Sequence, residues 1–149
     1  FKRQVSPGHN LGAIELLHYL SEKGIKLYLA SGTDKDDVIA EATAMGYAHL
    51  FNGGIYGAIG DVSKFSKKMV MEKIIKDNNL SGTELITFGD GPVEMRECRK
   101  VGGVAVGIAS DEIRRHGLSI EKRTRLIKAG AHLIIPDLSQ RNYLYEILF

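Results

Sequence analysis

The sequence predicts an α/β fold, with a three-layer, Rossmann-like arrangement in which helices cover both faces of a parallel sheet. Apolar stretches of strand length alternate with helical segments of about ten residues along the whole chain, and glycines or polar residues separate them. Such alternation is typical of right-handed strand–helix–strand crossovers, which produce parallel sheets. A length of 149 residues can bury a sizeable core, so we expect residues 1–149 to form one domain.

The helices are predicted from apolar residues that recur at helical spacing. In the first helix, Ile14, Leu17 and Leu20 share one face, and Gly24 follows as the expected C-terminal cap. A polar, basic helical stretch lies before the final strand. The other segments with helical spacing or capping residues are 34–45, 66–78, 94–101 and 140–149.

The strands are predicted from short apolar runs that end at turn residues. Residues 47–61 are rich in glycine and show little periodicity, so we expect a loop there that has room for a short strand or hairpin. The expected strands are 25–30, 85–88, 104–108 and 132–135.

Composition excludes several classes of protein. A net charge of +2 does not indicate a nucleic-acid-binding surface, and no apolar run is long enough to span a bilayer. The single Cys98 excludes an internal disulfide and fits a reducing compartment. No signal peptide is visible, so we expect a cytoplasmic protein without nucleic-acid or membrane partners.

The first candidate for chemistry is Ser31-Gly32-Thr33, which follows the strand predicted at 25–30. A hydroxyl and exposed backbone N–H groups before a helix can bind an anion. The alternative is ordinary capping of the helix that begins near Asp34. The nearby sequence Asp34-Lys35-Asp36 has a D-x-D spelling, but its place at a helix start indicates capping.

A second candidate is a group of lysines, Lys64, Lys67 and Lys68, at the start of the helix predicted at 66–78. A lysine there can balance the charge of a phosphate or of carboxylates. The alternative is that these are surface lysines of a solvated helix.

The third candidate is Asp90 with Glu94, which follow the strand predicted at 85–88. Ligands bind at the carboxyl ends of strands in open α/β sheets, and two acids at this spacing can share a hard cation, one of them through water or a hydrogen bond. Gly89 and Gly91 suggest that the backbone is shaped or closely approached there. Alternatively, Asp90 caps the next helix and Glu94 lies in its first turn.

Together, Leu-Ala-Ser31-Gly-Thr, a helix-entry lysine and Gly-Asp90-Gly-Pro-Val-Glu94 resemble the haloacid dehalogenase-like (HAD-like) hydrolase superfamily, in its phosphatase and phosphomutase branch. The resemblance covers about residues 7–147, and residues 1–12 look like the return from a cap domain. It implies that Ser31 and the Gly32 backbone bind the phosphoryl group.

The resemblance also implies roles for the charged residues. Lys67, or Lys64 as second choice, would neutralise the phosphate and the nucleophile. Asp90 would bind Mg²⁺, so that Ser31, Lys67 and Asp90 form the catalytic set. Glu94 would replace the aspartate more often found there, and its longer side chain leaves open whether it touches the metal directly.

One part of the family pattern is missing. Members attack phosphorus with an aspartate of a D-x-D pair that follows the central strand, and no apolar strand followed by D-x-D occurs here. We therefore expect a C-terminal portion of the fold that lacks the first central strand and the cap. The strand would come from residues outside this sequence, from a second chain or from a swapped partner.

The resemblance thus implies an Mg²⁺-dependent phosphatase for a small phosphorylated metabolite, inactive as these 149 residues alone. One alternative is a sugar phosphomutase of the same branch. Another is a catalytically silent regulatory or phosphate-binding module, with fusion to another enzyme as one form of it. A flavodoxin-like receiver or nucleotide-binding domain is a weaker alternative.

Overall fold

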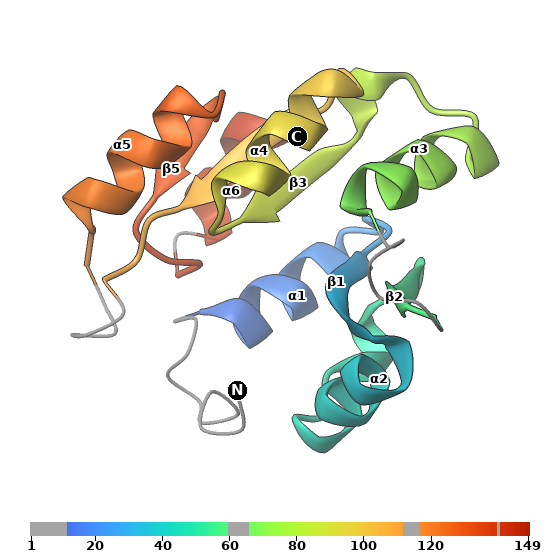
Figure 1. Ribbon diagram of the computed structural model, residues 1–149. Helices are drawn as coiled ribbons and strands as arrows, with labels where there is room; N and C mark the ends of the chain where they lie inside the picture. The colour runs from blue at the N-terminus through green and yellow to red at the C-terminus, as the bar shows by residue number, and fades with distance from the viewer. Residues whose placement is uncertain (1–11, 60–65, 112–116, 140) are drawn as a thin grey trace. The chain divides into compact units, whose positions relative to one another are not determined.

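The computed structural model describes residues 12–59, 66–111, 117–139 and 141–149 (Figure 1). By their internal contacts these residues belong to two units. Unit 1 comprises Phe1–Phe65 and Leu138–Phe149, and unit 2 comprises Ser66–Asp137. Both units contain parallel strands joined by helices, which confirms the predicted α/β class. The expectation of a single domain stays a prediction.

Unit 1 contains a strand–helix–strand motif. Strand β1 (Tyr28–Asp34) pairs in parallel with β2 (Gly54–Ala58), and α2 (Lys35–Ala44) contacts both strands. A short 3-10 helix, η2 (Ala48–Leu50), precedes β2. The carboxylate of Asp34 accepts a hydrogen bond from the Asp36 N–H at 3.1 Å, so the D-x-D spelling is a helix cap, as the sequence predicted.

Two further helices complete unit 1. Helix α1 (Ala13–Glu22) contacts α6 (Arg141–Leu148) and η2. Gly24 follows α1 with a φ of 80°, and this left-handed conformation confirms the expected glycine at the C-terminal end. The apolar side chains that these helices bury are Leu16, Leu20, Leu50 and Leu144.

Unit 2 has a three-stranded parallel sheet in the order β3-β4-β5. Helices α4 and α5 connect consecutive strands and contact each other, and α3 packs on α4. A 3-10 turn, η4, precedes the first strand. The elements are α3 (Lys67–Asp77), η4 (Gly82–Glu84), β3 (Ile86–Gly89), α4 (Pro92–Lys100), β4 (Val104–Ile108), α5 (Ile120–Lys128) and β5 (Leu133–Ile135).

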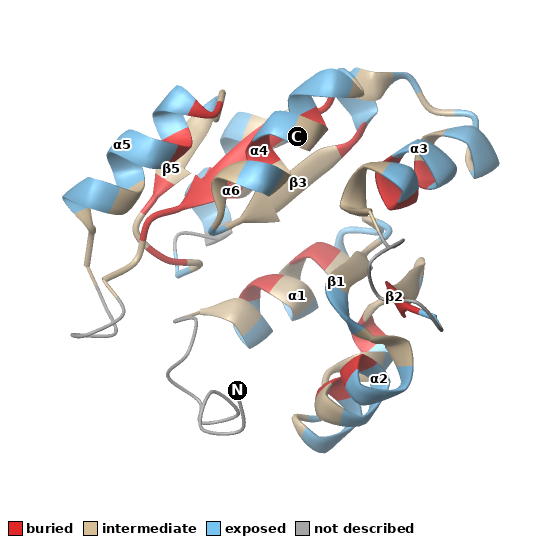
Figure 2. Ribbon diagram, viewed as in Figure 1, coloured by how far each residue is buried: buried red, intermediate tan, exposed pale blue. Residues whose placement is uncertain are grey.

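The core of unit 2 lies between its sheet and its helices. Figure 2 shows buried residues along β4 and on the helices of the unit, including α3. Cys98 belongs to this core, where burial raises the pKa of its thiol. The largest fully buried side chains of unit 2 are Met95, Leu126, Val106 and Cys98.

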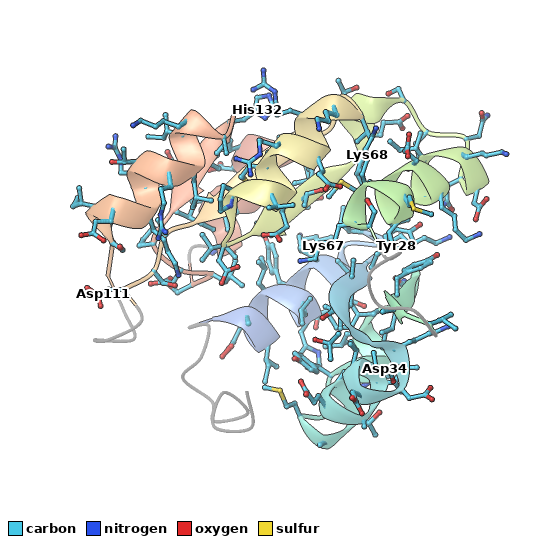
Figure 3. The ribbon with its side chains drawn as sticks, in the orientation of Figure 1. Tyr28, Asp34, Lys67, Lys68, Asp111 and His132 are labelled. Carbon is cyan, nitrogen blue, oxygen red and sulfur yellow. The ribbon has the colours of Figure 1, made fainter. Side chains whose placement is uncertain are left out.

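A histidine side chain extends the ladder between β4 and β5 (Figure 3). The buried N–H of Ala105 donates to Nδ1 of His132 at 3.0 Å, while the His132 N–H donates to the Ala105 carbonyl at 2.8 Å. The imidazole therefore takes the place of a backbone acceptor. For this reason β5 begins at Leu133, one residue later than the sequence predicted.

The sequence predicted most element limits to within two residues, but not those at β1 and β2. β1 begins three residues later than expected and continues through Ser31-Gly32-Thr33 to Asp34. The glycine-rich segment supplies β2, the short strand for which the sequence left room, and β2 is parallel to β1. The sequence did not predict the limits of β2, because glycine has a low strand propensity.

The described strands form two sheets where the sequence predicted one. β1 and β3 are the strands that the family resemblance places on either side of the missing central strand. Among the described residues, each has a hydrogen-bonded strand on one side only.

Within the part of the chain that the structure describes, none of the helices has the length and apolar character that a membrane span needs.

Candidate functional site

The Gly-Asp-Gly segment forms the turn between β3 and α4. β3 ends at Gly89, Asp90 is exposed in the turn, and Gly91 is the N-cap of α4, with Pro92 as the first helical residue. The Asp90 side chain therefore does not cap the helix. Within the described residues it has no hydrogen-bond or ion-pair partner. A carboxylate in this state suits a hard cation, which binds oxygen ligands.

Glu94 folds back over this turn. Its Oε2 accepts a hydrogen bond from the Gly91 N–H at 3.0 Å, which is one of the two bonds of a capping box, since Gly91 has no side chain to make the other. A Cβ on Gly89 would lie 2.9 Å from the Glu94 Cβ, and one on Gly91 would lie 2.9 Å from Oε2. Both glycines therefore make room for Glu94. The close approach inferred from the sequence is made by the protein itself.

The second oxygen of Glu94 binds Lys67, the first residue of α3, which is labelled in Figure 3. The Lys67 ammonium lies 3.0 Å from Oε1. The two side chains are 28% and 16% exposed, whereas the other ion pair described in unit 2, Lys73–Asp77, has side chains 59% and 50% exposed. The lysine at the site is thus held by a partly buried pair, in which the attraction is less screened than at the surface.

A second contact joins the same two helices. The Ser66 hydroxyl donates to Oε2 of Glu97 at 3.3 Å. The sequence reasoning did not identify either residue. The available signal was the spacing of two acids three residues apart on α4, which places Glu94 and Glu97 on one face.

In unit 1, Ser31, Gly32 and Thr33 form a bulge in β1. Ala30 is opposite Tyr56 and Asp34 is opposite Ala58, so these three residues face only Gly57. The Ser31 hydroxyl accepts a hydrogen bond from the Thr33 N–H at 3.2 Å. Asp34 provides the cap of α2, so the capping alternative for Ser31 is wrong. Bulges often re-aim side chains beside functional sites.

The bulge is compatible with a ligand at Gly32. A Cβ added to this exposed residue would have no heavy atom within 4 Å. Gly57 has the opposite environment, because a Cβ there would lie 2.6 Å from the Lys35 Cα. The fold therefore requires glycine at 57 and leaves the space above Gly32 open.

The predicted site residues thus fall in both units. Unit 2 brings Lys67 and Glu94 together beside the Asp90 turn, and unit 1 carries Ser31 and Gly32 on its bulge. Lys64 lies outside the described residues. In the parts of the chain that the structure describes, no three His, Cys, Asp or Glu side chains are grouped to hold a metal ion.

The resemblance found in the sequence is supported by a family model. The model of the haloacid dehalogenase-like hydrolases matches residues 5–108, which is more than half of the chain. The chain belongs to this family. No match was found among curated protein sequences.

Several solved structures share the HAD-like fold of this chain. A candidate β-phosphoglucomutase from Thermotoga maritima has a TM-score of 0.74 at 22% identity, over 93% of this chain and 60% of that chain. A conserved HAD-like protein of unknown function from Agrobacterium tumefaciens gives 0.76 at 16%, with the same coverages. A predicted phosphatase from Clostridium acetobutylicum gives 0.73 at 21%, over 91% and 59%.

At these identities the similarity establishes the fold. The HAD-like chain spans about 60% of the length of these proteins. Their shared architecture agrees with the Rossmann-like class predicted from the sequence.

Proposed function

We propose that this chain is the core portion of an Mg²⁺-dependent HAD-like phosphatase that acts on a small phosphorylated metabolite in the cytoplasm. The observation that carries the proposal is the pair Lys67–Glu94, which fixes an ammonium group beside the turn that exposes Asp90. Family membership supports phosphoryl transfer as the class of reaction. The nucleophilic aspartate and its central strand would come from outside this chain.

The residues of the chain would act by binding and by electrostatic stabilisation. The Ser31 hydroxyl and the Gly32 N–H would donate hydrogen bonds to phosphoryl oxygens, and the Lys67 ammonium would balance their negative charge. Asp90 would be the direct protein ligand of Mg²⁺, which when bound lowers the charge that develops during transfer. Since both Glu94 oxygens already have partners, Glu94 would act on the metal only indirectly.

The metal assignment can be tested on the chain as it is. Mg²⁺ titration followed by amide NMR should shift the resonances of the β3–α4 turn, and Asp90→Asn should abolish these shifts. Asp77→Asn is the control, because Asp77 is another exposed acid of unit 2, paired with Lys73. Equal Mg²⁺ responses in wild type and Asp90→Asn would contradict the assignment.

The chain alone should not release phosphate from an aryl phosphate, because no nucleophile follows a central strand. Release that survives Asp90→Asn would refute both the inactivity and the metal site. A phosphomutase is the second candidate, supported by the fold shared with the Thermotoga protein. A silent phosphate-binding module is the third, and it would have no nucleophilic aspartate at all.

These candidates differ in their products. A complete protein with a phosphatase cap would release inorganic phosphate, whereas a mutase would convert one sugar phosphate into another. A silent module would bind phosphate without turnover.

A further inference from the structure

Helix α3 begins in an electrostatically unfavourable way. Its first two residues are Lys67 and Lys68, and its first turn contains no acid. The N-terminus of a helix carries partial positive charge, so two ammonium groups there are repelled. The acids that this end lacks come from α4, since Glu94 binds Lys67 and Glu97 binds Ser66.

Ser66 is used in an unusual way for an N-cap residue. An N-cap serine normally accepts a hydrogen bond from a backbone N–H of its own first turn. The Ser66 side chain makes no such bond and instead donates to Glu97 at 3.3 Å. The Ser66 hydroxyl therefore binds α4 instead of capping α3.

The two contacts form a matched set. Two consecutive residues at the start of α3, the N-cap Ser66 and the first helical residue Lys67, bind two acids that lie three residues apart on α4. A lysine has a long, flexible stem, so a single ion pair fixes its ammonium poorly. A second contact at the preceding residue fixes the point from which that stem begins.

We propose that Glu97 is a positioning residue for Lys67. It holds the start of α3 through the Ser66 hydroxyl, so that the Lys67 ammonium stays on Glu94 rather than turning into solvent. What the positioned lysine does rests on the proposed function, in which it balances the charge of a bound phosphate.

The position of the ammonium can be measured without activity, by acetylation with acetic anhydride and mass spectrometry. The readout is the acetylation rate of Lys67 divided by that of Lys76, an exposed lysine on the same helix. Unfolding would also release Lys67 while Lys76 is already exposed, so the ratio is compared only under conditions in which circular dichroism shows every variant to be folded. Glu94→Gln, which removes the charged partner, sets the ratio expected for a released lysine.

Glu97→Ala and Ser66→Ala should each raise the ratio by about threefold. This is the change expected when Lys67 loses the stabilisation of a partly exposed ion pair, here the pair with Glu94. Glu97→Gln should keep the wild-type ratio, because its amide oxygen can still accept from the Ser66 hydroxyl. If Glu97→Ala lowers the melting temperature but leaves the ratio unchanged, Glu97 stabilises the packing of α3 on α4 without positioning Lys67. The proposal is then wrong. Failure of Glu97→Gln to rescue would also overturn it.

A second measurement separates this proposal from the proposed function. Inorganic phosphate, titrated with Mg²⁺ present, should bind about threefold more weakly to Glu97→Ala than to wild type or Glu97→Gln. If wild type binds no phosphate, the phosphate site assigned to this chain is refuted, while the acetylation ratio still decides whether Glu97 positions Lys67. If phosphate binds equally to all three while the ratio rises, the lysine is positioned but does not serve phosphate.

Discussion

Glu94 offers the clearest quantitative test, because its two oxygens have separate tasks. One accepts from the Gly91 N–H and the other binds Lys67. Loss of a helix cap costs about 1 kcal/mol, and a partly buried charged hydrogen bond, discounted for solvent, is worth about 1–2 kcal/mol. Glu94→Ala should therefore lower the free energy of unfolding by about 2–3 kcal/mol. Glu94→Gln keeps the cap and should cost about 1 kcal/mol.

The assay is urea unfolding followed by circular dichroism, with thermal unfolding beside it. A loss of 1 kcal/mol corresponds to about 2–4 °C in a chain of this size. The matched control is Asp77→Asn, which breaks the exposed pair with Lys73 and should cost at most about 0.5 kcal/mol.

Two results would refute this reasoning about Glu94. If Glu94→Gln costs no more than Asp77→Asn, burial adds nothing to the pair with Lys67. If Glu94→Ala and Glu94→Gln cost the same, the bond to the Gly91 N–H does not stabilise α4. A double-mutant cycle with Lys67→Ala isolates the coupling of the pair.

Three other substitutions test the structure of the two units. Gly57→Ala should cost about 1–3 kcal/mol in urea unfolding, because its Cβ would meet backbone at 2.6 Å. Gly32→Ala should leave stability unchanged. His132→Ala should cost about 1–3 kcal/mol, because the buried Ala105 N–H loses its acceptor. Burial raises the pKa of the Cys98 thiol above the ordinary cysteine value of 9.0. Above pH 9.0 the thiol of the unfolded chain therefore ionises before that of the folded chain, and the free energy of unfolding should fall.

Each of these outcomes has a result that contradicts it. Equal stabilities of the two glycine variants would mean that the bulge is not packed against Gly57. An unchanged His132→Ala protein would show that water replaces the imidazole. For Cys98, the check is alkylation by iodoacetamide, which should be slow in the native protein and fast in urea. Rapid alkylation of the native protein would contradict burial of the thiol.

Much of unit 2 could be predicted from the sequence because its signals are local. The apolar run before Gly89 and the helical spacing after Pro92 each determine one element. The charged residues of the site were also visible, since Asp90 and Lys67 lie at an element's end or beginning. Their partners were not visible, because the bond between Lys67 and Glu94 joins residues 27 positions apart.

The β1–β2 pair shows a different limit. The bulge at Ser31 depends on how β1 meets β2, and β2 itself is rich in glycine and has little strand signal. Such a strand forms because it pairs with a neighbouring strand, and its own side chains give little indication of it. The sequence therefore identified Ser31 as a candidate residue but ended the strand four residues before its observed end.

The bulge in β1 makes the candidate anion-binding segment at Ser31 an addition to the strand. Between Ala30 and Asp34 the strand carries two residues more than β2 carries between Tyr56 and Ala58. The hydroxyl-bearing segment is thus an insertion into a strand pair that is otherwise in register, and both ends of the insertion are anchored. We expect a variant shortened by two residues here to keep Asp34 opposite Ala58, and so to lose the candidate anion-binding segment while β1 and β2 stay paired.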